Sequence, residues 1–442
     1  MLYCSPYLRP SAIVSPMSIV AEDTVQASSM SVTSRSGFFW RLIGLAVALA
    51  VGFFTSILDL TLGRAGHMPV QPTYLALLMV AVFATFSLIN AVKNRSQWGT
   101  LVKIFGGSAP QIFSYSFIAA FSLLFSAFPQ AFWEDSGKWI LLIPYGYVIW
   151  IGTLIIVSHP LLAVSAQYGL RLGFILISSS VIYEIFYPGS FSNLLSRASG
   201  FAGNSNFGAL ATCMLCAAVL RYGEKKHRLL DLCCLSVTGI AVLATQSRSG
   251  MVEFAVVIGF WGLAVLLDKN FSVKEAGRLV ILALLTLLLL IFSVRFVFEQ
   301  GSLFSGEGNR FARILSGKSV DDGSGDERVG AAKDALRLIA EAPFFGHGTG
   351  HTRTMRVLPH NQYLQQWVNN GLCGLLAYLT LLVSAWILFY KKRSFAGMTF
   401  ISVSIFGSLF SHNLLDQRSF IIPLAILLGG LFQQSLDRVK IK

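Results

Sequence analysis

The stretch FFGHGTGHTRTMRVLPHNQYLQQWVNNGLCG, residues 344–374, joins the longest hydrophilic part of the chain to an apolar run. It holds a glycine-rich turn and three histidines before a helical pattern, and Pro359 fixes the backbone just before His360. If a helix begins at His360, its side chain shares one face with Leu364 and Trp367. In a first helical turn the dipole favours neutral imidazole, which can accept a proton. His360 is therefore a candidate general base, with a helix-capping histidine as the alternative.

The composition is that of a polytopic membrane protein. Of the 442 residues, 54% are hydrophobic and 12% are charged, and the mean hydropathy is +0.65. Soluble domains are less apolar than this. The formal net charge of +13 comes from short basic clusters between apolar runs, a pattern typical of membrane topology signals and not of a nucleic-acid-binding face.

Apolar runs of about 20 residues can cross the hydrocarbon core, and they predict an all-α integral membrane protein of about twelve transmembrane helices. Lys and Arg collect in alternate connections, which places both termini on the cytoplasmic side. The connection 158–169 is an exception because it holds no Lys or Arg, so Arg171 would extend to the interface. We expect spans near residues 38–58, 73–92, 110–128, 139–157, 170–187, 204–220, 229–245, 250–267, 279–296, 367–390, 395–411 and 420–435.

The long hydrophilic segment near the C-terminal spans is predicted to lie outside. Within it, residues 326–342 are expected to form an amphipathic helix on the bundle or membrane surface, with Val329, Ala332, Leu336 and Ile339 on its apolar face. The chain then divides into a flexible cytoplasmic tail (1–36), about nine spans (37–296), a large outer loop (297–366), about three spans (367–436) and a cytoplasmic tail (437–442).

Three arginines of the outer connections are candidate site residues. Arg248 lies in the short turn TQSRSG, where a guanidinium held at the interface suits phosphate binding; pairing with lipid phosphate or with Glu253 is the alternative. Arg197 lies in RASGFAGNSN, just before a helix N-terminus near Asn206, and its alternative is a solvated loop arginine. Arg328 follows two acidic residues, so a structural salt bridge is the favoured role.

The remaining polar features of the opening stretch point less clearly to chemistry. Three histidines could suit zinc, but no carboxylate shares their spacing, so no metal is expected. Gly371 and Gly374 are expected to permit a close helix contact.

In this order, these segments resemble the O-antigen ligase and Wzy-type polysaccharide polymerase superfamily. The resemblance covers roughly residues 190–390. It rests on the Arg197 loop, SRSG at Arg248, Arg328 with the helix leading to APFFGHGTG, and HNQYLQQWVNNGLCGL. Each piece alone is degenerate, and the likeness lies in their order and topological position.

The resemblance implies a GT-C-like glycosyltransferase of the bacterial inner membrane, with its active site on the periplasmic face and neither metal nor cofactor. His360 would deprotonate an acceptor hydroxyl, and Arg197 and Arg248 would bind the diphosphate of an undecaprenyl-diphosphate-linked glycan donor. Inversion would follow from a single displacement. Possible further substrate contacts are Arg328, Asn206, Asn361 and His351.

The acceptor stays open between a growing glycan, the lipid A core and a protein hydroxyl. Lipopolysaccharide and exopolysaccharide biosynthesis are both compatible with the motifs. The alternative function is a multi-span transporter or flippase of a lipid-linked or polyanionic glycan. A water-filled path lined by Arg171 and Glu184 would favour transport.

Overall fold

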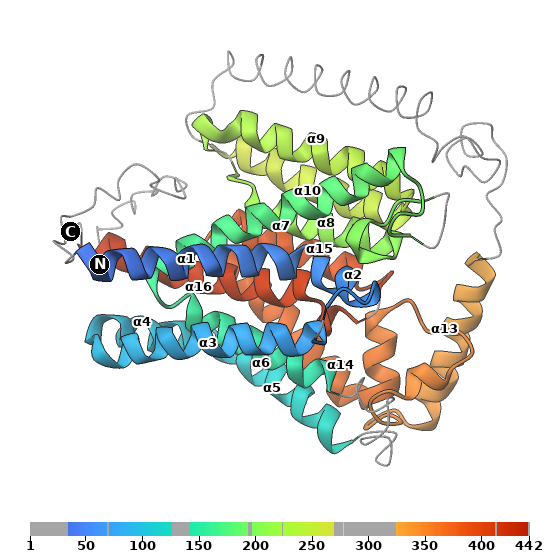
Figure 1. Cartoon of the computed structure of the whole chain (residues 1–442). Helices are drawn as coiled ribbons and strands as arrows, with labels where there is room; N and C mark the ends of the chain where they lie inside the picture. Colours follow the sequence, from blue (N-terminus) through green and yellow to red (C-terminus); the bar gives the residue numbers. More distant parts are fainter. Residues whose placement is uncertain are drawn as a thin grey trace, which may run out of the picture.

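The computed structural model describes residues 34–68, 70–125, 141–192, 197–222, 224–268, 277, 324–411 and 413–440. All regular elements in these ranges are helices, which confirms the predicted all-α class. Residues 1–33, the predicted span at 279–296 and the first part of the predicted outer loop lie outside the described residues. Figure 1 shows most of the described helices running along one direction as a bundle.

Apolar helices occur at all the predicted spans that fall within the described ranges. They are α1 (Ser34–Thr55), α3 (Pro72–Lys93), α5 (Ala109–Leu124), α6 (Leu142–Ile156), α7 (Pro160–Phe186), α8 (Ser205–Val219), α9 (Arg228–Thr245), α10 (Arg248–Leu266), α14 (Gln362–Lys391), α15 (Phe395–Gly407) and α16 (Arg418–Lys440). Two further helices, α2 (Leu58–Arg64) and α4 (Arg95–Gly107), lie in connections where none was predicted.

By length and composition, six helices in the described ranges could cross a membrane, namely α1, α3, α7, α9, α10 and α14. The other five apolar helices are shorter, at 10–17 residues each when α16 is counted over its apolar part, Arg418–Gln433. The count of twelve spans therefore stays a prediction, while the multi-pass character is supported.

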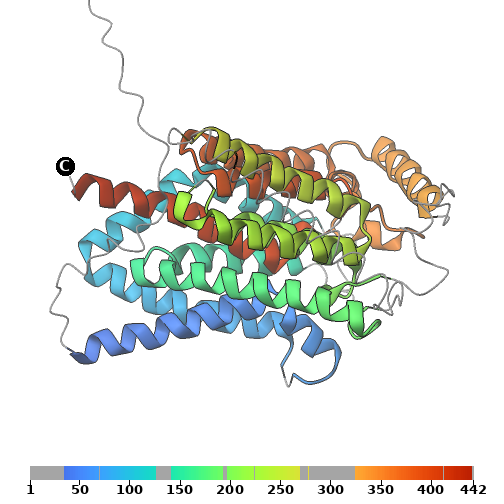
Figure 2. The same cartoon turned by 90° about the horizontal axis from the view of Figure 1, so that it is seen from above.

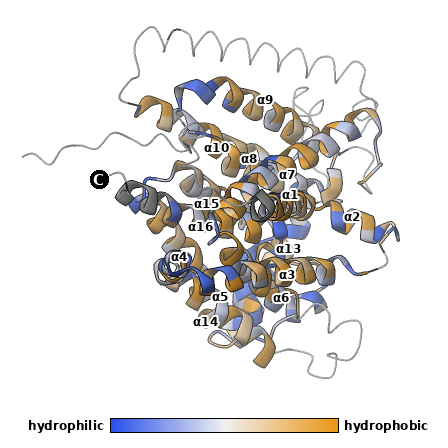
Figure 3. Cartoon of the chain, turned by 60° about the vertical axis from the view of Figure 1, so that its left-hand side comes forward, coloured by the Kyte–Doolittle hydropathy of each residue, from blue (hydrophilic) through white to orange (hydrophobic). Residues whose placement is uncertain are grey.

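Helix α1 illustrates why these helices are apolar on more than one side. Val47 and Val51 are buried, and α1 packs along α7. Leu42, Leu45 and Leu49 lie on another face, where each stays more than half exposed. In Figure 3 the apolar colouring likewise extends over outer helices such as α9. Exposed leucines at helical spacing are what a helix facing lipid requires.

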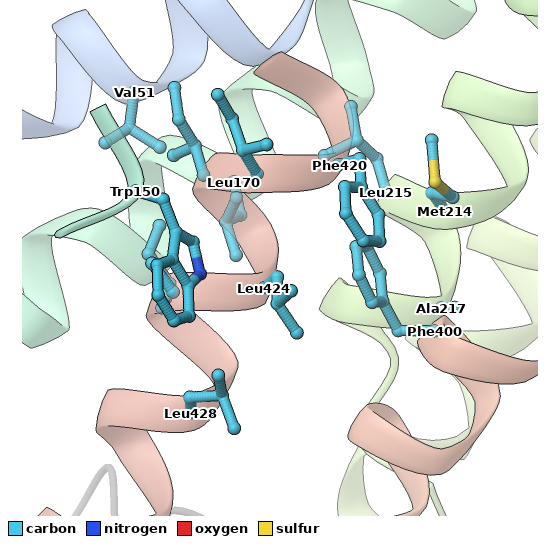
Figure 4. Close-up of a cluster of buried hydrophobic side chains, with 14 of the residues drawn as sticks. Val51, Trp150, Leu170, Met214, Leu215, Ala217, Phe400, Phe420, Leu424 and Leu428 are labelled. Atoms are coloured by element: carbon cyan, nitrogen blue, oxygen red, sulfur yellow. The ribbon is translucent and has the colours of Figure 1, made fainter. Parts of the chain in front are cut away.

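Helix α8 lies at the centre of the bundle and packs against α7, α9, α10, α15 and α16. Its residues from Gly208 to Ala217 are all buried, and many are small, which lets the neighbouring backbones approach closely. Figure 4 shows its Met214 and Leu215 beside Phe400 of α15 and Phe420 of α16. The rings of Phe400 and Phe420 stack with centroids 5.8 Å apart.

The two ends of the bundle can be told apart by the chain direction. Helix α1 begins and α16 ends at the same end of the bundle, the left in Figures 1 and 2. We call this the terminal end. The connections α7–α8 and α9–α10 and the start of α14 lie at the other end, together with α13 (Ser324–Glu341). We call this the site end.

The inside connection predicted at 158–169 is wrong, because this segment is the first part of α7. Pro160 occupies the first turn, where its missing N–H costs nothing, and the turn before it contains only Val157, Ser158 and His159. The helix reaches 27 residues, more than the roughly 20 needed to span a bilayer. Arg171 therefore lies within the helix and not beside a turn.

Helix α13 confirms the predicted amphipathic segment, but the buried face differs from the predicted one. Ala331, Ala335 and Ile339 are buried, whereas Val329 and Leu336 are each 54% exposed. The helix packs against α14 rather than resting on a surface through its larger side chains. Of the four predicted residues, Ile339 is buried and Ala332 is half-buried, and the other buried positions are alanines, which allow close contact with α14.

Candidate functional site

The loop that carries Arg197 is built around one buried carboxylate at the end of α7. Glu184 has no exposed surface. Its two oxygens accept four backbone N–H groups at 2.6–2.8 Å, from Phe191, Ser192, Ser199 and Gly200. A charge buried at this depth is stable only with such donors. Both described arms of the loop are therefore fixed to one side chain.

The same loop is also held by α2. Thr61 Oγ1 donates to the carbonyl of Phe201 at 2.7 Å, and Arg64 donates to that of Ala202 at 3.5 Å. Gly200 has φ +54°, and a Cβ there would lie 2.4 Å from Ser180 Oγ. Only glycine satisfies both the conformation and the space.

We expect Glu184→Gln to loosen this loop strongly. The amide keeps one acceptor oxygen but turns an NH₂ group toward backbone N–H donors, and each buried donor left unsatisfied costs about 1–3 kcal/mol. Thermal unfolding in detergent should show a lower Tm than wild type. Glu341→Gln, at an exposed position on α13, is the matched control and should leave the Tm unchanged. Equal melting of both variants would contradict the loop-holding role of Glu184.

Arg197 joins three segments at the site end. Its Nε donates to the carbonyl of Thr245 at 3.0 Å, and its Nη2 donates to Asn206 Oδ1 at 3.1 Å. Asn206 Oδ1 also accepts a hydrogen bond from Ser247 Oγ at 2.9 Å. The predicted proximity of Arg197 to Asn206 is thus observed, and the pair also contacts the turn that precedes Arg248. Arg197, Asn206, Thr245 and Ser247 form a hydrogen-bonded group that we call the arginine cluster after Arg197.

Arg248 is the first residue of α10, and its side chain is exposed. The turn before it is tight because Gln246 adopts φ +50°, and Ser247 caps the helix by accepting from the N–H of Gly250 at 3.2 Å. The alternative of a pair with Glu253 is wrong, because Glu253 is buried in the bundle and the described residues contain no Arg248–Glu253 ion pair. Arg248 is therefore available at a helix N-terminus.

Helix α14 is broken at Gly371, where φ is +63° and ψ is −166°. The break exposes backbone groups that the segment after α13 satisfies. His347 and Gly348 donate to the carbonyls of Val368 and Asn369 at 2.8 and 2.9 Å, and Leu372 donates to the carbonyl of Pro343 at 2.8 Å. Gly346, Gly348 and Gly350 all have positive φ, which confirms the predicted glycine-rich turn. Non-helical backbone in a membrane helix is tolerated only with such partners.

The first half of α14 presents a buried face of amides that the sequence prediction missed. Asn369 Oδ1 accepts from the N–H of Thr352 at 3.0 Å, and Asn370 Oδ1 accepts from Thr349 Oγ1 at 2.7 Å. Gln365 exchanges hydrogen bonds with Asn413 in the loop before α16. The signal was available, because the amides recur at helical spacing at Gln362, Gln365, Gln366, Asn369 and Asn370.

His360 lies just before α14 and not in its first turn. Asn361 is the N-cap, and its Oδ1 accepts from the N–H groups of Tyr363 and Leu364 at 2.9 and 3.1 Å. The pKa of His360 is lowered from its ordinary value by burial and by the positive charge of Arg328. The neutral imidazole is therefore favoured, as expected, but for a different reason than the helix dipole. Arg328 is exposed on α13, and its charge contributes to the lowered pKa of His360; the local salt bridge stays a prediction.

Removing the charge of Arg328 should raise the pKa of His360. If His360 is the general base that the resemblance implies, Arg328→Gln should move the acidic limb of the pH–rate profile to higher pH, because the base is active only when neutral. The profile of kcat/KM measures this shift. Arg337→Gln removes a charge from an exposed position on the same helix and should leave the limb in place. An unshifted acidic limb in Arg328→Gln would mean that the charge of Arg328 does not affect the pKa of the titrating group.

The other two histidines form a stacked pair. The rings of His347 and His351 lie 4.6 Å apart at 22°, and His347 Nε2 is 2.8 Å from the carbonyl oxygen of Leu338 on α13. The pKa of His351 is lowered by burial and by its neighbour. The pair thus fastens the glycine-rich turn to α13, and a substrate contact by His351 stays a prediction.

A small polar cavity of about 40 Å³ lies beside the amide face of α14. Arg353 and Asp416 line it from two short 3₁₀ helices, η6 (His351–Thr354) and η7 (Leu414–Asp416). Burial raises the pKa of Asp416 to about 7, and the charge of Arg353 opposes this rise. A water needs about 10–15 Å³ of such space, so the cavity admits a few waters and no sugar. Neither residue was singled out from the sequence.

Comparison with known families places most of these residues in one segment. Residues 233–379 match the family model described as O-antigen ligase. This segment belongs to the O-antigen ligase family. The O-antigen ligase segment contains Arg248, Arg328 and His360, while Arg197 and Asn206 precede it and contact it through Thr245 and Ser247. The resemblance read from the sequence is thereby confirmed over this part of the chain. A search of curated proteins found no match.

Proposed function

We propose that this protein transfers a glycan from an undecaprenyl-diphosphate-linked donor to an acceptor hydroxyl at the periplasmic face of the bacterial inner membrane. The observation that most supports this proposal is a half-buried histidine with a lowered pKa, His360, in the O-antigen ligase segment. This histidine lies at the site end of the bundle, where the arginine cluster and Arg248 also lie. A base and a group of cations at one end suit a reaction that moves a proton and releases a diphosphate.

In the proposed reaction His360 takes the proton of the acceptor hydroxyl. The acceptor oxygen then forms a bond to the anomeric carbon of the donor sugar while the bond from that carbon to the diphosphate oxygen breaks. The electron pair leaves with the lipid diphosphate. A single displacement inverts the anomeric centre and needs no covalent enzyme intermediate.

Arg197 and Arg248 would stabilise the diphosphate as its charge grows. The backbone and Asn206 fix the guanidinium of Arg197, so its direction is set before substrate binds. Arg248 starts a helix, where the N-terminal end of the dipole also attracts anions. Preorganised donors of this kind contribute most when they act on charge that develops in the transition state.

Arg248→Lys is expected to lose activity although the charge is retained. Lysine cannot form two parallel hydrogen bonds to a phosphate, and one lost donor to a developing charge costs roughly 100-fold in rate. The transfer rate from a labelled lipid-linked glycan measures the effect. Arg95→Lys, at an exposed position at the start of α4, is the control. A fully active Arg248→Lys variant would favour an arginine that only extends to lipid phosphate.

The transporter alternative predicts that Arg171 and Glu184 line one path, and their positions do not support it. Glu184 is occupied by backbone donors of a loop. Arg171 lies thirteen residues earlier on α7, roughly 20 Å away at 1.5 Å per residue. The two side chains therefore do not meet along one short path.

Gene deletion followed by electrophoresis of surface polysaccharide tests the proposed class. Loss of all glycan attached to lipid A indicates a ligase, and attachment of single repeats indicates a polymerase. Loss of a secreted polymer with intact lipopolysaccharide indicates an exopolysaccharide polymerase. Unchanged surface and secreted glycans would contradict the proposed function.

A further inference from the structure

The small polar cavity beside the amide face of α14 has walls that hydrogen bonds hold in place. Gln362 Oε1 accepts from the backbone N–H of Leu414 at 3.0 Å, which holds η7 against α14. Asn369 Oδ1 accepts from the backbone N–H of Thr352 at 3.0 Å, which holds η6 against the same helix. The shape of the cavity is therefore set before a substrate binds.

Two buried oxygen atoms at this cavity have no hydrogen-bond partner among the described residues. They are Asp416 Oδ1 and Thr352 Oγ1, and the Thr352 side chain has no exposed surface. Buried polar atoms of this kind are normally satisfied by water or by a ligand. A ligand group can replace such water without loss only if it reproduces the hydrogen bonds.

The cavity also offers hydrogen-bond donors from the amide face. Gln366 Oε1 accepts from Asn370 at 2.8 Å, and Asn369 Oδ1 is occupied by Thr352, so both carbonyl oxygens are used within the protein. The NH₂ groups of Gln366 and Asn369 can then donate to a group in the cavity that these residues line. A hydroxyl group suits this mixture, because it both donates and accepts.

The charged side chains at the cavity have opposite signs. Arg353 and Asp416 both line it, and the charge of each favours the charged form of the other. This pairing favours neither an anion nor a cation as the occupant. A neutral polar group is the better match.

The size and position of the cavity limit what can enter it. At about 10–15 Å³ for each water, its volume of about 40 Å³ has room for a hydroxyl or hydroxymethyl group, while a sugar ring stays outside. Gln362, which lines the cavity, is two residues from His360. Two residues of extended chain span about 7 Å, a separation that one sugar can bridge.

We propose that this cavity receives a hydroxyl-bearing substituent of the sugar that lies next to His360 during transfer. The substituent would donate to Asp416 Oδ1 and accept from the hydroxyl of Thr352, which gives both buried oxygens a partner. These two residues would then help to determine which sugar is accepted. The inference rests on the proposed function, and it applies to the donor sugar or the acceptor sugar, which the test separates.

The test is a kinetic assay of the purified full chain with donor and acceptor extracted from the deletion strain. Burial raises the pKa of Asp416 to about 7, so the assay is run at about pH 8, where the carboxylate is mostly charged. We expect Thr352→Val to raise the KM of one substrate by roughly two- to tenfold, the effect of one hydrogen bond, with kcat nearly unchanged. The substrate whose KM rises is the one that carries the bound hydroxyl.

A second variant and a matched control make this result specific. Asp416→Asn should raise the same KM at least as much, because a carboxylate accepts a stronger hydrogen bond than an amide does. Thr354→Val removes a hydroxyl from an exposed position on the same short helix and should leave both KM values unchanged. Thr352→Val should also keep the wild-type Tm, since Thr352 Oγ1 has no hydrogen-bond partner among the described residues.

The possible failures of the two proposals can be told apart. Unchanged KM values for both substrates in Thr352→Val, with wild-type transfer intact, would exclude this cavity from sugar binding and leave the proposed function standing. This result decides even if Asp416→Asn does not fold. A lower Tm of Thr352→Val without a change in KM would make the role of the hydroxyl structural. Absence of transfer by the wild-type protein would overturn the proposed function and this inference with it.

Discussion

His360→Ala should abolish glycan transfer while leaving the protein in the membrane. Removing a general base costs roughly 10²- to 10⁴-fold in rate. The half-buried side chain lies before the N-cap Asn361, so its loss leaves the capping hydrogen bonds of α14 intact. We therefore expect a catalytic loss without a comparable loss of stability. Surface glycan in a deletion strain that carries the variant measures the effect.

Two comparisons make the His360 result specific. His67→Ala removes an exposed histidine outside the site and should restore normal glycan. His360→Gln keeps hydrogen-bonding capacity without a basic nitrogen, so it should fail like the alanine variant. Immunodetection in membrane fractions controls for the amount of protein. Normal surface glycan from His360→Ala would exclude this residue as the base.

Gly371→Ala should disrupt the junction between α14 and the glycine-rich turn. The backbone angles at Gly371 lie in a region that only glycine occupies, which costs about 1–3 kcal/mol for another residue. A Cβ would also lie 2.1 Å from the carbonyl oxygen of Phe344, which is backbone and cannot rotate away. The hydrogen bonds of His347 and Leu372 across the junction would have to separate. We expect a lower Tm and loss of transfer together.

Gly330→Ala is the matched control for this backbone effect. Gly330 lies in α13, and no neighbouring side chain or loop comes within 4 Å of the position that a Cβ would take there. Alanine should therefore be neutral or stabilise the helix by up to about 1 kcal/mol. Thermal unfolding of both variants in the same detergent compares them directly. Wild-type melting of Gly371→Ala would mean that the break in α14 is not required.

The positions of the helices could be predicted well because run length and hydropathy decide them. The predicted span 73–92 corresponds to α3, Pro72–Lys93, and 229–245 corresponds to α9, Arg228–Thr245. The segment 158–169 was predicted to be an inside turn although it holds no Lys or Arg. The absence of basic residues alone could not distinguish a turn from the start of a helix. Pro160 was the better signal, since proline favours a first helical turn.

The candidate site could be predicted only in part. The contact of Arg197 with Asn206 spans nine residues and follows from the local loop. Its contact with Thr245 spans 48 residues, and no local pattern indicates it. The sequence allows Glu184 as part of a transport path, but the donors that it binds come from a loop whose folding the sequence does not reveal. Long-range partners therefore decided which polar residues form a site.

The broken helix has a mechanical consequence for substrate entry. Backbone hydrogen bonds fasten residues 343–348 to both sides of the break, and His347 and buried alanines fasten α13 to the same region. A segment tied in this way cannot swing as a flap without losing several bonds at once. Helix α13, the glycine-rich turn and the first half of α14 should therefore move as one rigid unit. A long donor would then enter along the side of this unit, because the unit does not lift to admit it.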